Sequence, residues 1–178
     1  RELDGETATG TPGKISVTDD VQFASVAASY GGNAVAAVDT SGRIWTWGGY
    51  PIGRSGDPAI PARIVSTTDI AAANGGIDIE TVPFAKVAVG RSAMVALDRF
   101  GRLWSWAYSE STADEAGRTS SYATVPVMLT AATTGVPGFD EQRFVDVVQG
   151  DGYGFALHED GNLWVWNLTY DGTKYVSP

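Results

Sequence analysis

The chain has 178 residues, of which 43% are hydrophobic and 19% charged, a composition that supports a folded core and excludes a disordered chain. Its net charge of −9 argues against a nucleic-acid partner, because phosphate binding depends on clustered Lys and Arg and the 12 basic residues are scattered. With no cysteine there is no disulfide, thiol nucleophile or thiolate metal site, and no apolar run approaches the roughly 18 residues of a membrane helix.

The N-terminal region divides into two parts. Residues 1–11 are polar, so we expect them to form a flexible segment. They contain neither a starting Met nor the apolar core of a signal peptide, which indicates a processed or excised chain. Residues 12–17, PGKISV, have a Pro-x-x-Ile pattern that predicts a short strand.

One eight-residue phrase then occurs three times, as GRIWTWGG (42–49), GRLWSWAY (101–108) and GNLWVWNL (161–168). The first tryptophans of successive copies lie 59 and 60 residues apart, and a fixed period of this size predicts a repeat architecture. Similar segments also precede each copy: FASVAAS, FAKVAVG and FVDVVQG. We therefore expect three repeats, at about 12–65, 66–129 and 130–178.

Each repeat divides into four short strands, which we name strands a to d in chain order. In the first repeat, strands a to d are expected at FASV (23–26), AVAAV (34–38), RIWTW (43–47) and PARIV (61–65); in the second, strand d is PVML (126–129). Strand c is apolar on both faces, which favours a blade buried between two neighbouring blades. Each b–c turn also has a glycine where a tight hairpin needs a positive φ.

The sequence therefore predicts an all-β protein, a β-propeller of three four-stranded blades. Its structural core is expected to consist of the six repeated tryptophans and the three turn glycines: Trp45, Trp47, Trp104, Trp106, Trp164, Trp166, Gly42, Gly101 and Gly161.

The repeat resembles that of the regulator of chromosome condensation family. The resemblance rests on F-x-x-V-x-x-G, then Gly-x-Leu/Ile-Trp-x-Trp-Gly, then GRSG at 53–56, and it covers about residues 21–178. The first copy matches best; the second keeps only Gly-Arg at 117–118, and the third lacks this last element. Members of the family are β-propellers, and they include an exchange factor that binds chromatin and inhibitors of β-lactamases. The resemblance thus implies a fold but no single activity.

Enzyme signatures are incomplete in this sequence. GKI at 13–15 lacks most of a P-loop, and GDGYGF at 150–155 lacks the last glycine of a dinucleotide fingerprint. The single histidine, His158, occupies the turn position that Asp39 and Asp98 occupy in the other repeats, and paired acids do not recur at equivalent positions. We expect no catalytic residue, no cofactor and no metal site.

Function is expected to lie in the loops. In an antiparallel blade the a–b and c–d loops emerge on one side, and here they carry tyrosines, which give large contact areas at low entropic cost. The main interpretation is a non-catalytic protein-interaction module, bacterial and at the cell surface; the alternative is a carbohydrate-binding propeller, and single tyrosines could instead pack against neighbouring loops. The candidate partner-binding residues are Tyr30, Tyr50, Tyr108, Tyr153 and Tyr170.

Three blades leave the outer faces of the first and third blades without neighbours. The third repeat reaches Pro178 where strand d is expected to begin, so it lacks its own strand d, whereas residues 12–17 resemble a spare one. We expect residues 12–17 to pair with the third blade of another copy or of a missing continuation of the chain. Two copies arranged head to tail would form a six-bladed ring; the alternative is an excised fragment of a longer propeller.

Overall fold

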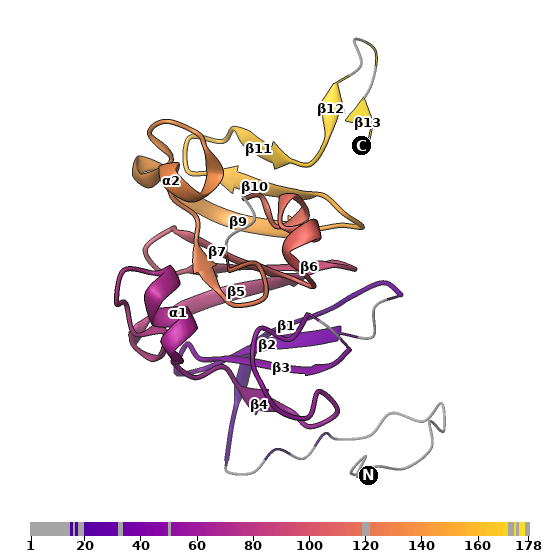
Figure 1. The fold of residues 1–178 in the computed structure, drawn as a ribbon, viewed down its shortest axis with the longest axis vertical. Helices are drawn as coiled ribbons and strands as arrows, with labels where there is room; N and C mark the ends of the chain where they lie inside the picture. Colours follow the sequence, from indigo (N-terminus) through magenta and orange to yellow (C-terminus); the bar gives the residue numbers. More distant parts are fainter. Residues whose placement is uncertain are drawn as a thin grey trace.

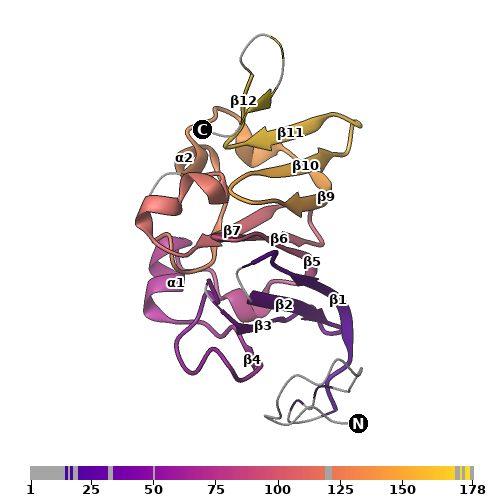
Figure 2. The same ribbon diagram turned by 90° about the vertical axis from the view of Figure 1, so that its right-hand side faces the viewer.

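The computed structural model describes residues 15, 17, 20–31, 34–49, 51–118, 122–170, 173 and 175–176. The segment expected to be flexible lies outside these residues, as do residues 12–14 and 16 of the expected N-terminal strand. The described chain forms three antiparallel sheets of three or four strands, which we call blades 1 to 3, and one separate two-stranded sheet. The blades are stacked face to face in chain order (Figure 1). Figure 2 shows the stack from the side, with blade 1 at one end and blade 3 at the other.

Blades 1 and 2 have four strands each, in sequential order, as the sequence predicts. Blade 1 contains β1 (Phe23–Ala28), β2 (Ala34–Asp39), β3 (Ile44–Gly48) and β4 (Ala62–Arg63). Blade 2 contains β5 (Phe84–Val89), β6 (Ala93–Asp98), β7 (Leu103–Ala107) and β8 (Val127–Met128).

In blade 3 the sequence predicts strands a to c from the repeat itself and a strand d from elsewhere. Its described sheet has three, in the order β11-β10-β9: β9 (Phe144–Gln149), β10 (Gly154–His158) and β11 (Leu163–Trp166). The residues after β11 form a separate two-stranded pair, β12 (Thr169–Tyr170) and β13 (Tyr175–Val176), which the sequence did not predict.

The sequence analysis also missed short helices in the links between blades, because one or two turns are too short to show a helical period. Thr67 and Thr130 cap α1 and α2 with their side chains, which replace hydrogen bonds that the first turn lacks. Figure 1 shows α1 and α2 on the same side of the stack. The helical segments are α1 (Thr68–Ala73), η1 (Ile79–Thr81), η2 (Glu110–Thr112), η3 (Asp114–Ala116), α2 (Ala131–Thr134) and η4 (Phe139–Glu141).

Each blade has two different faces. The Trp face carries both tryptophans of strand c, and we call the opposite face the back face. The Trp face of blade 2 packs on the back face of blade 1, where Trp104 and Trp106 are fully buried in one core cluster with Ile44. The back face of blade 2, including Leu103, packs on the Trp face of blade 3 around Ala156. Each interface therefore joins a Trp face to a back face.

The blades at the two ends of the stack are covered on one face only. The prediction that both faces of strand c are buried holds for β7, whose residues are all buried. In β3 the two tryptophans are only half-buried, and in β11 Leu163 is 68% exposed on the back face. The difference arises because only blade 2 has a neighbour on each side.

A backbone hydrogen bond joins each blade to the next through the b–c turn. The Phe84 N–H donates to the Gly42 carbonyl at 3.0 Å, and the Phe144 N–H donates to the Gly101 carbonyl at 2.9 Å. Gly42 and Gly101 have φ values of 83° and 78°, and a Cβ on either would lie 3.1–3.2 Å from the backbone of the next blade. These turns need glycine both for the positive φ and for the close approach.

The aspartate before the b–c turn holds the first tryptophan of the phrase. Asp39 Oδ2 accepts from Trp45 Nε1 at 2.9 Å, and Asp98 Oδ2 accepts from Trp104 Nε1 at 3.1 Å. His158 stands at this position in blade 3, where its Nδ1 accepts from the Asp160 N–H in the same turn. His158 is thus the last residue of β10, and its side chain contacts the turn that follows.

Candidate interaction site

The a–b and c–d loops lie on one rim of the stack. Two contacts join these loops: the Tyr108 N–H donates to the Ser92 carbonyl at 2.7 Å, and Gln149 Nε2 donates to the Glu115 carbonyl at 2.8 Å. The b–c turns instead contact the first strand of the next blade, through the bonds at Gly42 and Gly101 described above. We call this side of the stack, which the sequence analysis selected for function, the rim.

Three residues at the same repeat position, just after the first strand of each blade, meet on the rim. Tyr30, Arg91 and Asp151 stand at the same offset from the phenylalanine that opens each blade. They line one depression of about 160 Å³ that spans the three a–b turns. The repeat thus brings an aromatic ring, a cation and a carboxylate, all exposed, to the wall of one hollow.

The predicted tyrosines differ in their exposure. Tyr30 is 91% exposed and Tyr108 is 60% exposed, so both are available to a partner. Tyr153 is half-buried and makes an edge-to-face contact with Phe155 of β10, with ring centroids 6.0 Å apart, so it packs against its own blade. Tyr50 lies outside the described residues, and only the backbone of Tyr170 is described, in β12.

Glu115 adds a carboxylate whose protonation is perturbed. Its pKa is raised chiefly because the side chain is partly buried, and Asp114 and Asp151 raise it further. A hydrogen bond with Ser92 and the charge of Arg91 lower the pKa in part. Burial and two neighbouring carboxylates therefore both disfavour the ionised form of Glu115.

Sequence reasoning missed the charged members of this site. Arg91 and Asp151 do not resemble Tyr30, so a search for one repeated residue type overlooked them, although their equal offset would have identified the position. No periodic signal could have identified Glu115, because the c–d loop that carries it has no equivalent of similar sequence in the other repeats.

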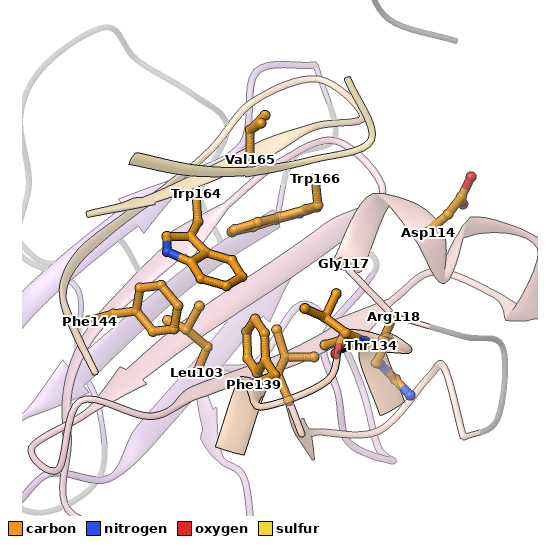
Figure 3. Close-up of a pocket in the computed structure, with 12 residues that line it drawn as sticks. Leu103, Asp114, Gly117, Arg118, Thr134, Phe139, Phe144, Trp164, Val165 and Trp166 are labelled. Atoms are coloured by element: carbon orange, nitrogen blue, oxygen red, sulfur yellow. Dashed lines mark hydrogen bonds between the residues drawn. The ribbon is translucent and has the colours of Figure 1, made fainter. Parts of the chain in front are cut away.

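A second hollow lies between blades 2 and 3, away from the depression on the rim. This hollow, which we call the β11 groove, has a volume of about 310 Å³ and is mainly apolar. Figure 3 shows Trp164 and Trp166 directed toward Phe139 and Leu103, whereas Val165 points to the other side of β11. At its margin lies the buried Arg118, whose pKa burial lowers to about 10, so that it stays cationic at neutral pH.

Neither hollow has the residues of a metal centre. Among the described residues there is no group of three or more His, Asp or Glu side chains that could hold a metal ion. In the same part of the chain, no helix has the length and apolar character needed to cross a membrane.

Comparison with known proteins identifies the fold but no specific relative. No family model matches the chain, and no curated protein matches it. The structure of human WBSCR16 aligns with 82% of this chain at 21% identity and a TM-score of 0.58. Yeast RCC1, called Prp20, solved with Kap60 bound, aligns with 79% of this chain at 18% identity and a TM-score of 0.57.

The chain spans about a third of these neighbours, since the alignments take in 34% and 31% of their lengths. At such low identity the likeness concerns the fold alone. Together with the stacked blades and the repeated phrase, it confirms the fold that the sequence predicts: the chain is a partial β-propeller of RCC1-like repeats.

Proposed function

We propose that the chain is a non-catalytic protein-interaction module whose rim binds a basic, extended segment of a partner protein. Two observations carry the proposal: exposed Tyr30 lines the rim depression together with Asp151, and exposed Tyr108 is bonded through its N–H to Ser92, whose side chain hydrogen-bonds Glu115. Tyrosine is enriched among residues that dominate binding energy at protein interfaces, because it combines a large apolar surface with a hydrogen-bonding hydroxyl.

Charge favours a basic partner. The chain carries a net charge of −9, and the rim places Asp114, Glu115 and Asp151 around a single exposed cation, Arg91, among the residues that surround Glu115. A Lys or Arg of the partner near Glu115 would stabilise its carboxylate, whose ionised form is disfavoured chiefly by burial and further by Asp114 and Asp151. Such a field also steers association and makes it depend on ionic strength.

A structural neighbour supports a binding role. One Prp20p structure, which aligns with 75% of this chain at a TM-score of 0.54, concerns the binding of that protein to Gsp1p and histones. Use of a propeller of this type for protein binding is therefore established for a protein of the same fold, and the proposal extends the use to this chain.

Fluorescence polarisation with labelled 15-residue peptides of basic, neutral and acidic composition tests the proposal. We expect the basic peptides to bind most tightly, with an affinity that falls as the salt concentration rises. We expect the affinity of the Tyr108→Ala variant for these peptides to be at least tenfold lower. Phe100→Ala is the matched control: Phe100 is also 60% exposed but lies on the b–c turn, away from the rim.

Three results would overturn the proposal. The first is equal affinity for all peptide classes, and the second is an equal loss of peptide affinity in Tyr108→Ala and Phe100→Ala. The third is a glycan-array signal that Tyr108→Ala abolishes without any peptide binding, which would favour the carbohydrate-binding alternative. A location at the bacterial cell surface stays a prediction, which surface labelling of the producing cell would test.

A further inference from the structure

A pocket lies where the c–d loops of blades 1 and 2 meet α1, the helix in the link between these two blades. It is lined by residues 51–55 of the first loop, by the start of α1, and by residues 107–108 and 124–125 of the second loop. Its volume of about 420 Å³ falls in the range of about 300–1,000 Å³ that is usual for ligand pockets. We call it the Tyr108 pocket, and it lies between two complete four-stranded blades.

The Tyr108 pocket combines an apolar floor with a polar margin. Ile52, Ile70 and Ala107 line it and are buried, so they form its deep part. Tyr108 and Asp69 also line it and are exposed, so they stand at its margin. This arrangement suits a long basic side chain, because such a side chain buries its aliphatic stem and keeps its charged head near water.

The two charged residues of the pocket favour a cation over an anion. Within the described part of the chain, the Asp69 carboxylate has neither a hydrogen bond nor an ion pair. Arg54 is already engaged in its own loop: its Nε donates to Thr46 Oγ1 at 3.2 Å, and its Nη2 donates to the carbonyls of Thr46 at 2.9 Å and Ile60 at 2.7 Å. Asp69 is therefore the charge that selects the occupant, in keeping with the net charge of −9.

Tyr108 favours arginine over lysine as that cation. A guanidinium is planar, so it can stack on an aromatic ring and also pair with a carboxylate through two parallel N–H···O bonds. The ammonium of lysine is a strongly hydrated point charge and lacks this fork geometry. An exposed tyrosine ring and an exposed carboxylate on the wall of one pocket offer both contacts.

The indole of Trp106 lies directly beneath the pocket. Gly53 lines the pocket, and a Cβ built on Gly53 would be 2.7 Å from Trp106 Nε1. This nitrogen is buried and has no hydrogen-bond partner in the described structure, whereas the equivalent Trp166 Nε1 of blade 3 donates to the Glu115 carbonyl at 3.0 Å. A group that enters the pocket beside Gly53 will therefore change the surroundings of an indole N–H that is unpaired.

We propose that the Tyr108 pocket binds one arginine side chain of the basic segment and so anchors this segment on the rim. The inference rests on the proposed function and adds a preference for one residue type at one place. The aliphatic part of the arginine lies over Ile52 and Ile70. Its guanidinium stacks on the Tyr108 ring and pairs with the Asp69 carboxylate, as a buried anchor residue does at a protein interface.

Fluorescence polarisation with three lysine-rich 15-residue peptides, which differ only in an Arg, Lys or Leu at the central position, tests the proposal. We expect the arginine peptide to bind about tenfold more tightly than the lysine peptide of equal charge, and the leucine peptide to bind most weakly. Asp69→Asn should abolish the difference between Arg and Lys. Glu159→Gln is the matched control, because it also removes one exposed negative charge but lies on the b–c turn of blade 3, and it should keep the difference.

Two-dimensional NMR of the tryptophan indole N–H groups then locates the arginine. The Trp106 signal should shift when the arginine peptide is added. The Trp45 signal should not, because Trp45 Nε1 donates to Asp39 at 2.9 Å beside the b–c turn, away from the rim.

Four results would overturn the anchor site: equal affinity for the arginine and lysine peptides, tightest binding of the leucine peptide, the same loss of preference in Asp69→Asn and Glu159→Gln, or a Trp106 signal that does not shift. Equal and salt-dependent affinity for the arginine and lysine peptides would remove the anchor site and leave the proposed function standing. Absence of binding by any basic peptide would overturn both.

Discussion

Trp104 and Trp45 test how much of the blade core depends on a neighbouring blade. They occupy the same repeat position, each donates Nε1 to the preceding aspartate, and each meets a phenylalanine edge to face. They differ in burial: Trp104 is fully buried beneath blade 1, whereas Trp45 is half-buried on an uncovered face. A comparison of the two alanine variants therefore isolates the contribution of inter-blade packing.

Trp104→Ala is expected to lower the free energy of unfolding by about 3–5 kcal/mol. A buried tryptophan removes about 150–250 Å² from water, which at about 25 cal/mol per Å² gives roughly 4–6 kcal/mol, near the range measured for such truncations. Asp98 keeps a partner when the indole is removed, because Arg102 Nε donates to its Oδ2 at 2.7 Å, so little further cost arises there. For Trp45→Ala the partial burial gives about 2 kcal/mol.

Urea unfolding followed by circular dichroism, at a protein concentration low enough for the monomer, measures both values. If the alanine variant does not fold, Trp104→Phe, which keeps part of the packing, replaces it in the measurement. A loss under about 1 kcal/mol for Trp104→Ala, or equal losses at Trp104 and Trp45, would refute the reasoning from burial.

Two further predictions concern single side chains. Gly101→Val should cost more unfolding free energy than Gly161→Val by about 1–3 kcal/mol in the dilute monomer, because both strain a positive φ but only the first meets the backbone of Phe144; equal costs in urea unfolding would contradict this. Glu115→Gln should be more stable than the original chain at pH 7, because a raised folded-state pKa makes the ionised carboxylate unfavourable in the folded protein. The difference should shrink as the pH falls through the raised pKa and vanish below the ordinary value of 4.5, and thermal melts that show no pH dependence would exclude the assigned cause.

The sequence alone determined the repeat, the blade and most strand positions. Strands expected at 23–26, 34–38 and 43–47 lie within one residue or two of β1, β2 and β3. The reason is physical: short strands bounded by turns are encoded locally, in apolar composition and in the turn glycine at Gly42, whose φ of 83° no other residue adopts easily. The repetition of one pattern three times also strengthened each single assignment.

The tertiary structure decided which residues at the same repeat position have the same burial and the same surroundings. Trp45, Trp104 and Trp164 read alike in the sequence, yet only Trp104 is fully buried. Trp45 lies on a face without a described neighbouring blade, and Trp164 lies at the β11 groove, where no described strand pairs with the outer edge of β11. Likewise, the rim site joins Tyr30 to Arg91 and Asp151, which share a position but no chemistry, and only the stacking of three blades places them around one hollow. Local sequence specifies the blade, whereas contacts between blades specify the site.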